Sequence, residues 1–147
     1  MKIYMDVCCL SRPFDNLSQP RVRLEAIAVI NILECCRSGQ WTLAASDVLD
    51  FELAAIQDNE KKMQVRELYS LADNWLPVTA PAKARAVFLQ SQGLSFFDSL
   101  HLALAEASRQ DVFLTTDDKL LKCANKIDLN IRVANPVVWF MEVAVET

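Results

Sequence analysis

The sequence predicts an α/β domain in which a central, mainly parallel sheet lies between two layers of helices. Short apolar segments typical of buried strands alternate along the chain with longer segments whose apolar residues recur at helical spacing. Only two of the 147 residues are glycine, which also favours helices. A chain of this length is about the size of one compact domain, so we expect a single domain over residues 1–147.

The first element expected is a buried strand over residues 1–6, a short apolar run that stops at Asp6. The following segment, residues 7–16, begins apolar and ends with turn-forming residues, so a loop is expected there. Arg12 is the only cation of that segment.

A long helix and a second strand should follow. Ser18 is a candidate cap, Pro20 is tolerated in a first helical turn, and Gly39 should end the helix after about Arg37. The expected apolar face consists of Val22, Ala26, Val29, Ile30 and Leu33. The apolar segment 41–46 then predicts a second buried strand, which completes a β-α-β unit.

The rest of the chain continues the alternation. Helices are expected over residues 47–57, with Glu52 on the second turn, over 60–75, and from Pro81 to Gly93. Residues 76–78 suit a short edge strand, where proline is allowed. Further expected elements are an alanine-rich helix over 98–107, a strand over 112–115, a helix from residue 116, a strand over 131–133 and a final short helix after Asn135 and Pro136.

Composition excludes several classes of protein. A net charge of -4 argues against a protein that coats nucleic acid through a broad basic face. No apolar run is long enough to span a bilayer and no signal segment opens the chain, so we expect a cytoplasmic protein without membrane contact. The five cysteines are odd in number and lack Cys-x-x-Cys spacing, which fits neither a disulfide framework nor a zinc site.

Four acids follow or flank predicted strand ends: Asp6, Glu52, Asp98 and Asp117. Because functional groups of parallel sheets gather outside the carboxyl ends of the strands, these side chains are expected at one edge. Clustered carboxylates supply the hard oxygen ligands that Mg²⁺ or Mn²⁺ prefers. Two such ions can activate a water and neutralise the leaving oxygen of a phosphodiester, so the pattern predicts metal-dependent cleavage of nucleic acid.

Each candidate has a structural alternative. Asp98 and Asp117 are well placed as helix N-caps, and Glu52 can simply face solvent. His101 lies one turn beyond Asp98 and either touches the site or makes a structural hydrogen bond. Lys119 and Lys122, with Lys126, form a stripe that either follows a phosphate backbone or is a solvated helix face.

These segments together resemble the PIN-domain nuclease family, which includes the VapC-like ribonuclease toxins. The resemblance rests on the apolar strand ending in Asp6, on Ser46 with Glu52 six positions later, on Asp98-Ser-Leu-His-Leu-Ala, and on Leu114-Thr-Thr-Asp117. It covers nearly the whole chain and includes the order of the motifs. It implies a three-layer α/β/α, Rossmann-like PIN fold.

The resemblance also implies a function. It points to an Mg²⁺- or Mn²⁺-dependent endoribonuclease, the toxin of a type II toxin-antitoxin pair, commonly dimeric and silenced by a cognate antitoxin. Carried over by position, Asp6, Glu52, Asp98 and Asp117 are the catalytic and metal-binding acids. Thr115 or Thr116 supplies a supporting hydroxyl, His101 lies beside the acids, and Arg12, Lys119 and Lys122 contact RNA. Asp118 competes with Asp117 for the fourth place.

One departure from the family keeps an alternative open. Many relatives carry a polar residue two positions after the first acid, where this chain has Cys8, and a soft thiol is a poor ligand for a hard ion. The alternative function is a catalytically silent PIN-like module that acts through protein or RNA binding. A phosphotransfer role for Asp6 as nucleophile is disfavoured, because Val7 and Cys8 stand where a second acid is needed.

Overall fold

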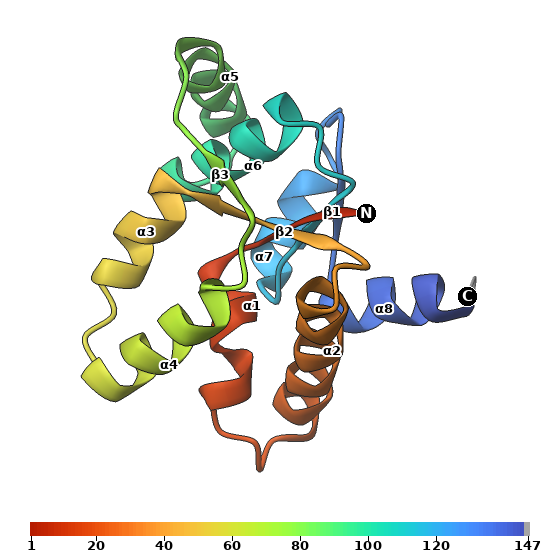
Figure 1. Cartoon of the computed structure of the whole chain (residues 1–147). Helices are drawn as coiled ribbons and strands as arrows, with labels where there is room; N and C mark the ends of the chain where they lie inside the picture. The colour runs from red at the N-terminus through yellow and green to blue at the C-terminus, as the bar shows by residue number, and fades with distance from the viewer. Residues whose placement is uncertain (146–147) are drawn as a thin grey trace.

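The structure, a computed structural model, describes residues 1–145, with backbone only at residue 145, and contains one five-stranded sheet (Figure 1). The strand order is β3-β2-β1-β4-β5, and every neighbouring pair is parallel. The strands are β1 (Lys2–Met5), β2 (Thr42–Ser46), β3 (Asn74–Leu76), β4 (Val112–Leu114) and β5 (Arg132–Ala134). The predicted parallel α/β architecture is confirmed.

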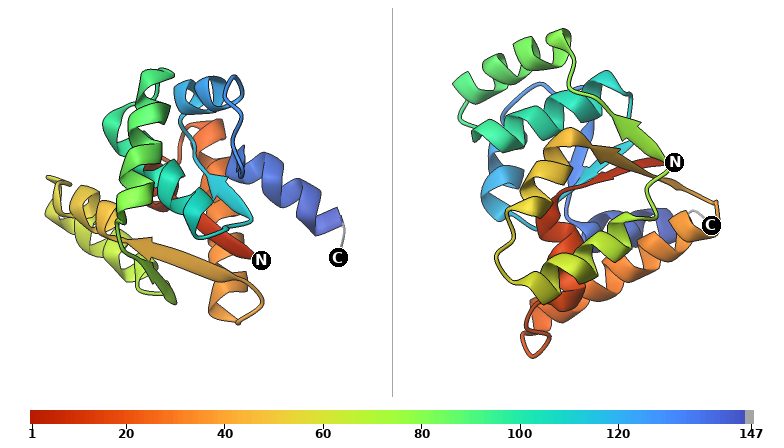
Figure 2. Two further views of the ribbon diagram at one scale, coloured as in Figure 1. Left: turned by 90° about the horizontal axis from the view of Figure 1, so that it is seen from above. Right: turned by 60° about the vertical axis from the view of Figure 1, so that its left-hand side comes forward.

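Helices connect the strands and cover both faces of the sheet, as Figure 2 shows with α2 and α8 on one side and α5 and α6 on the other. Their bounds are α1 (Val7–Ser11), a 3-10 turn η1 (Arg12–Phe14), α2 (Pro20–Arg37), α3 (Asp47–Ala54), α4 (Asn59–Tyr69), α5 (Ala80–Ser91), α6 (Phe96–Ala107), α7 (Asp118–Ala124) and α8 (Pro136–Val145).

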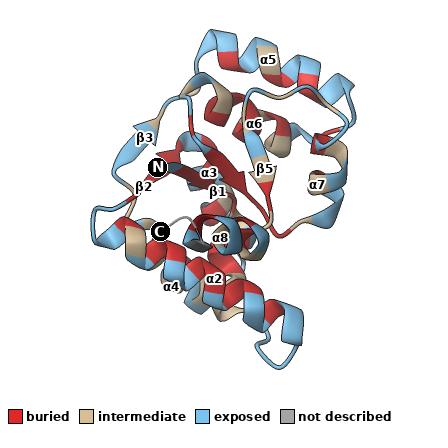
Figure 3. Ribbon diagram, turned by 90° about the vertical axis from the view of Figure 1, so that its right-hand side faces the viewer, coloured by how far each residue is buried: buried red, intermediate tan, exposed pale blue. Residues whose placement is uncertain are grey.

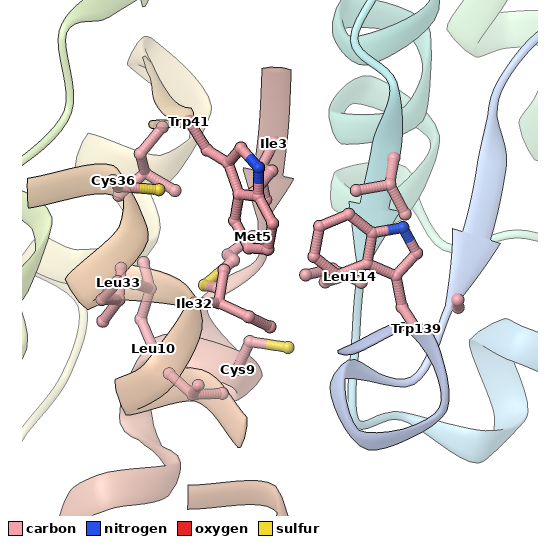
Figure 4. Close-up of a cluster of buried hydrophobic side chains, with 14 of the residues drawn as sticks. Ile3, Met5, Cys9, Leu10, Ile32, Leu33, Cys36, Trp41, Leu114 and Trp139 are labelled. Atoms are coloured by element: carbon pink, nitrogen blue, oxygen red, sulfur yellow. The ribbon is translucent and has the colours of Figure 1, made fainter. Parts of the chain in front are cut away.

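The alternation of side chains along β1 divides the core into two layers. Ile3 and Met5 pack on one face against Ile32 of α2 and Trp139 of α8 (Figure 4), whereas Tyr4 packs on the other face among residues of α3 and α6. All three β1 side chains are fully buried, as expected for the central strand of a parallel sheet. Figure 3 shows the same arrangement, with β1 and β2 mostly buried, the edge strand β3 largely exposed, and helices that expose their outer sides.

The segment after β1 is helical from Val7 to Phe14, so the loop predicted over residues 7–16 is wrong for these eight residues. Helix α1 starts directly at Val7 because Asp6 adopts an extended backbone and caps it, and η1 continues the turn to Phe14. An isolated five-residue helix is not stable, and its sequence therefore gives little signal. Burial of Cys9 and Leu10 supplies the stabilisation that local propensity lacks.

Helix α2 differs from the prediction in its cap and in one core position. Pro20 begins the helix as expected, but Gln19 occupies the cap position and Ser18 instead bonds the side chain of Asn16. Ile30 was assigned to the core, yet it is 41% exposed. Gly39, at φ +85°, ends the segment as predicted, since glycine adopts that backbone conformation readily.

The predicted helix over residues 60–75 is too long. Helix α4 ends at Tyr69, and Trp75 instead belongs to β3, the edge strand predicted two residues further on at 76–78. The backbone of Asn74–Leu76 pairs with β2, so sheet pairing overrides the helical pattern of the preceding residues. Within residues 1–145, no helix is both long and apolar enough to cross a membrane.

Candidate functional site

Asp6 stands at the carboxyl end of the central strand, where it caps α1. Its Oδ1 accepts a hydrogen bond from the Cys9 backbone at 3.0 Å, and the residue is only 4% exposed. Burial raises the pKa of Asp6 to about 6, against the lowering effect of hydrogen bonds from Thr115 and Cys9. The negative charge of Asp98 raises it further. Asp6 is therefore a carboxylate whose ionised form is poorly compensated.

Asp98 lies in the first turn of α6, on a different element from Asp6. The structural alternative for it is wrong, because Ser95 caps this helix and its Oγ accepts the Asp98 N–H at 3.2 Å. Partial burial raises the pKa of Asp98, and Asp117 and Glu52 add to the rise. The Asp98 carboxylate is thus not used to cap the helix that carries it.

Asp117 is the N-cap of α7, the role considered as its structural alternative. Its Oδ1 accepts hydrogen bonds from the backbone of Lys119 at 2.9 Å and of Leu120 at 3.3 Å. The Thr115 Oγ1 accepts the Asp117 N–H at 3.1 Å and so fixes the turn that holds this acid. A cap needs only one carboxylate oxygen, so the role leaves Oδ2 available to a ligand.

The neighbouring Asp118 points elsewhere. Its two oxygens bond the Arg21 guanidinium at 2.6 and 2.7 Å on an exposed surface, and this hydrogen bonding lowers the pKa of Asp118. Of the two competing candidates for the fourth acid, Asp117 is the one that lines a depression with Asp98 and another with Glu52.

Glu52 does not simply face solvent. Its Oε1 lies 2.5 Å from Nε2 of His101, and His101 is fully buried. On the opposite side of the ring, Nδ1 lies 2.5 Å from the Tyr4 hydroxyl. The predicted proximity of His101 to the acids is therefore accompanied by the structural hydrogen bonds that were its alternative.

Two depressions meet at Asp117. One, of about 520 Å³, is lined by Gly93, Leu94, Ser95, Asp98, Asp117, Lys119, Leu120 and Cys123. The other, of about 490 Å³, is lined by Val7, Cys8, Ser11, Arg12, Asp15, Glu52, Ile56, Lys61, Thr116 and Asp117. The two depressions therefore share Asp117, and each contains a second candidate acid and at least one cation, Lys119 in the first and Arg12 and Lys61 in the second.

The cations near the two depressions differ in their ion pairing and in whether they line a depression. Arg12 is bound to Asp15 at 3.0 Å and to the buried Glu25 at 2.9 Å, so its guanidinium is partly neutralised. Lys119 lines the depression that holds Asp98. Lys122 is exposed and is not among the residues that line either depression. Lys61, which sequence reasoning did not single out, lines the Glu52 depression and bonds Asp15 at 2.6 Å.

The pKa of the Cys8 thiol is affected by all four candidate acids. Although the residue is exposed overall, burial of its thiol raises the pKa to about 12, and all four acids add to the rise. These acids are Asp6, Asp117, Asp98 and Glu52. Charges from four separate segments of the chain thus raise the pKa of the same thiol, which stays protonated at neutral pH.

The candidate acids have the ligand atoms that a divalent cation prefers, but their side chains are not arranged around a common position. Hard carboxylate oxygens and uncompensated negative charge suit Mg²⁺ or Mn²⁺. However, residues 1–145 contain no group of three or more His, Cys, Asp or Glu side chains already arranged to hold a metal ion. Asp6 and Asp98 are the residues that would bind the ion, with Asp117 beside them, and their side chains would have to move closer together around it.

Sequence reasoning missed the hydrogen-bonded partners of this region. Tyr4 was assigned only to a buried strand, and its bond to His101 crosses from β1 to α6. A hydroxyl at a central, buried strand position was the available signal, because buried polar groups require partners.

Comparison with known proteins supports the fold. No family model matches the sequence, and a search of curated proteins found no match. Among solved structures, FitAcB from Neisseria gonorrhoeae is similar at a TM-score of 0.60 and 20% identity, over 91% of this chain and 97% of that one. VapBC2 from Rickettsia felis, whose structure contains a promoter DNA fragment, gives 0.59 and 14%, over 92% and 98%.

A third structure, PAE2754 from Pyrobaculum aerophilum, is similar over 99% of this chain and 90% of that one, at a TM-score of 0.58 and 14% identity. All three similarities extend across nearly the whole of both chains. At these identities they establish architecture, which agrees with the resemblance noted in the sequence. The chain therefore has the three-layer α/β/α fold of PIN-domain, VapC-like proteins.

Proposed function

We propose that this protein is an Mg²⁺- or Mn²⁺-dependent endoribonuclease that acts through Asp6, Asp98, Asp117 and Glu52. The observation that carries the proposal is Asp117, which lines both depressions, one together with Asp98 and the other together with Glu52, while Asp6 is buried at the end of the central strand. Burial makes the ionised Asp6 carboxylate costly to stability and raises its pKa to about 6, with a contribution from Asp98, and acids with perturbed pKa values concentrate at functional sites. A bound cation would remove the cost.

Each of these residues has a proposed role that follows from its position in the site. Asp6 and Asp98 would hold a divalent cation, which when bound activates a water and neutralises the leaving oxygen of a phosphodiester. Asp117, fixed by Thr115, contributes the free oxygen of its capping carboxylate. Lys119 supplies positive charge to the depression that holds Asp98, where the phosphate of an RNA strand could bind, whereas Arg12 and Lys61 in the other depression are already paired with acids.

We further propose that the chain is the toxin of a toxin-antitoxin pair, acts in the cytoplasm, and forms a homodimer. Support comes from FitAcB and VapBC2, which are toxin-antitoxin complexes and share the fold of this chain. The surface of α2 is consistent with a protein partner, because Leu24, Ile27 and Ile30 are 57%, 55% and 41% exposed.

The test is cleavage of a labelled, unstructured RNA in the presence of Mn²⁺, together with calorimetric Mn²⁺ binding. Asp6→Asn and Asp98→Asn keep the shape of the side chain and remove its charge, and each should lower the cleavage rate by more than about a hundredfold. The matched control is Asp128→Asn. Asp128 is an exposed acid that precedes β5, toward the amino ends of the strands rather than their carboxyl ends. Cleavage that survives in both site variants would contradict the proposal.

A second function is favoured by one observation. Because no preformed group of metal ligands exists in residues 1–145, a silent PIN-like module that binds a protein or RNA is the competing proposal. The same experiment separates the two. Native protein that binds RNA in a filter assay, but neither cleaves it nor binds Mn²⁺ with or without RNA, would establish the silent module.

A further inference from the structure

A chain of buried hydrogen bonds links the interior of the sheet to Glu52. The Tyr4 hydroxyl lies 2.8 Å from the Ser46 Oγ and 2.5 Å from Nδ1 of His101, and Nε2 of His101 lies 2.5 Å from Oε1 of Glu52. Ser46, Tyr4 and His101 are fully buried, whereas the Glu52 side chain is 28% exposed and lines a depression of the candidate site. This series of hydrogen bonds therefore extends from the core to the surface of the candidate site.

Which group donates in each of these hydrogen bonds follows from the number of buried hydroxyl hydrogens that need an acceptor. The Ser46 Oγ already accepts the Leu49 N–H at 3.0 Å, as the cap of α3. If Tyr4 also donated to Ser46, the Ser46 hydroxyl hydrogen would be buried without an acceptor, which is costly. If Ser46 donates to Tyr4 instead, the Tyr4 hydrogen is free to bond Nδ1 of His101. Every donor then has an acceptor.

The donor and acceptor roles of these groups determine which nitrogen of the His101 imidazole carries the hydrogen. Nδ1 accepts from Tyr4 and carries no hydrogen, so the neutral ring has its hydrogen on Nε2 and donates it to Glu52. Burial raises the pKa of Tyr4 well above its usual value, so its hydroxyl keeps its hydrogen. Tyr4 also stacks on Phe113, with ring centroids 5.3 Å apart, and this contact holds the hydroxyl in place.

We propose that Tyr4 and His101 are positioning residues, which orient the Glu52 carboxylate in the site through the donor chain Ser46, Tyr4, His101, Glu52. The Nε2–H of His101 fixes Oε1 and leaves Oε2 for the depression that also contains Asp117. Glutamate has three rotatable bonds, and a single anchored oxygen restricts them. The role in catalysis rests on the proposed nuclease function, whereas the bond directions do not.

His101 is the only histidine of the 147 residues, so the imidazole can be observed directly. Long-range ¹H–¹⁵N NMR of uniformly labelled protein at neutral pH distinguishes a nitrogen that bears hydrogen from one that does not. We expect the native protein to show one tautomer, with hydrogen on Nε2 and none on Nδ1. A native ring with hydrogen on Nδ1, or on both nitrogens, would overturn the proposed direction.

Tyr4→Phe tests the chain without removing the ring that packs on Phe113. We expect the ¹⁵N signals of His101 to move toward a mixture of tautomers, because Nδ1 loses its donor. The matched control is Tyr69→Phe, which removes a hydroxyl that also bonds Ser46, but at the backbone N and O, at 2.9 and 3.3 Å. That variant should lose stability and keep the native His101 signals. Native signals in Tyr4→Phe, or equal changes in both variants, would refute the proposal.

Kinetics on the RNA substrate separate positioning from binding. Tyr4→Phe should lower kcat about tenfold and leave KM close to native, since Tyr4 is buried away from the substrate. Tyr69→Phe should leave both values close to native. If native protein cleaves no RNA but the NMR results are as expected, the proposed nuclease function fails and the donor chain stands. If cleavage is present and kcat of Tyr4→Phe is unchanged, the positioning role fails.

Discussion

Replacing Asp6 with asparagine should make the protein more stable at neutral pH while it abolishes activity. The Asp6 carboxylate is buried, and Asp98 adds a like charge nearby. Asparagine keeps an oxygen that can accept the Cys9 N–H, and it is as good an N-cap as aspartate. The substitution therefore removes the cost of the charge and retains the cap, although the amide nitrogen of asparagine cannot accept the hydrogen bond from Thr115.

The pKa gives the magnitude and the pH window. A rise from 3.8 in the unfolded chain to about 6 in the fold corresponds to about 3 kcal/mol. Because the folded state binds the proton more tightly, the native protein is relatively stabilised below pH 4 and loses this contribution as pH rises to about 6. The cost is complete at pH 7. For a protein of this size it corresponds to a difference in Tm of roughly 6–12 °C.

The assay is thermal unfolding followed by circular dichroism, in EDTA, at intervals from pH 4 to pH 8. The Tm of Asp6→Asn should exceed that of the native protein at pH 7, and the difference should shrink toward zero at pH 4. Adding Mn²⁺ should raise the Tm of the native protein more than that of the variant, since a ligand stabilises the state that binds it. A variant less stable than native at pH 7, or a difference independent of pH, would refute the argument.

Three further substitutions, with one exposed control, test the scaffold around the site by urea unfolding. Glu25→Leu should destabilise the protein by roughly 3–5 kcal/mol, because Glu25 is 1% exposed and its loss leaves Arg12 without its buried partner; a smaller loss would mean that Asp15 alone satisfies Arg12. Leu49→Ala should cost roughly 2–5 kcal/mol, since Leu49 is fully buried, whereas Met63→Ala, at a position 71% exposed, should change stability by less than about 0.5 kcal/mol. Gly93→Ala should cost roughly 1–3 kcal/mol, because Gly93 has φ +110°, and an unchanged stability would show that the turn can relax.

The sequence was sufficient for the order of the elements and for the edge that carries the acids. Ile3 and Met5 alternate with Tyr4 in a pattern that depends only on the pleat of a strand, and the acid that follows is placed by the chain direction. For the same reason the fold class and the parallel sheet could be predicted without any tertiary information.

What the sequence could not provide were features that depend on contacts between distant segments. Helix α1 is too short to form alone and exists because Asp6 caps it and Leu10 is buried, so a loop was predicted there. Trp75 continues a helical pattern locally, but its backbone pairs with β2. Likewise, the sequence does not show that Arg21 of α2 bonds both oxygens of Asp118, the contact that favours Asp117 in the proposed site.

The position of β1 in the centre of the sheet has a consequence for synthesis of the protein. This strand leaves the ribosome before either of its neighbours, and one of them, β4, comes late: Met5 pairs with Leu114. Until β4 emerges, one side of β1 has unpaired backbone groups, and Asp117 is still missing from the cluster. Contacts between such distant segments form slowly, and the incomplete chain is exposed to aggregation. A nascent or prematurely terminated chain therefore lacks the assembled site, and any activity should begin only after release of the full domain.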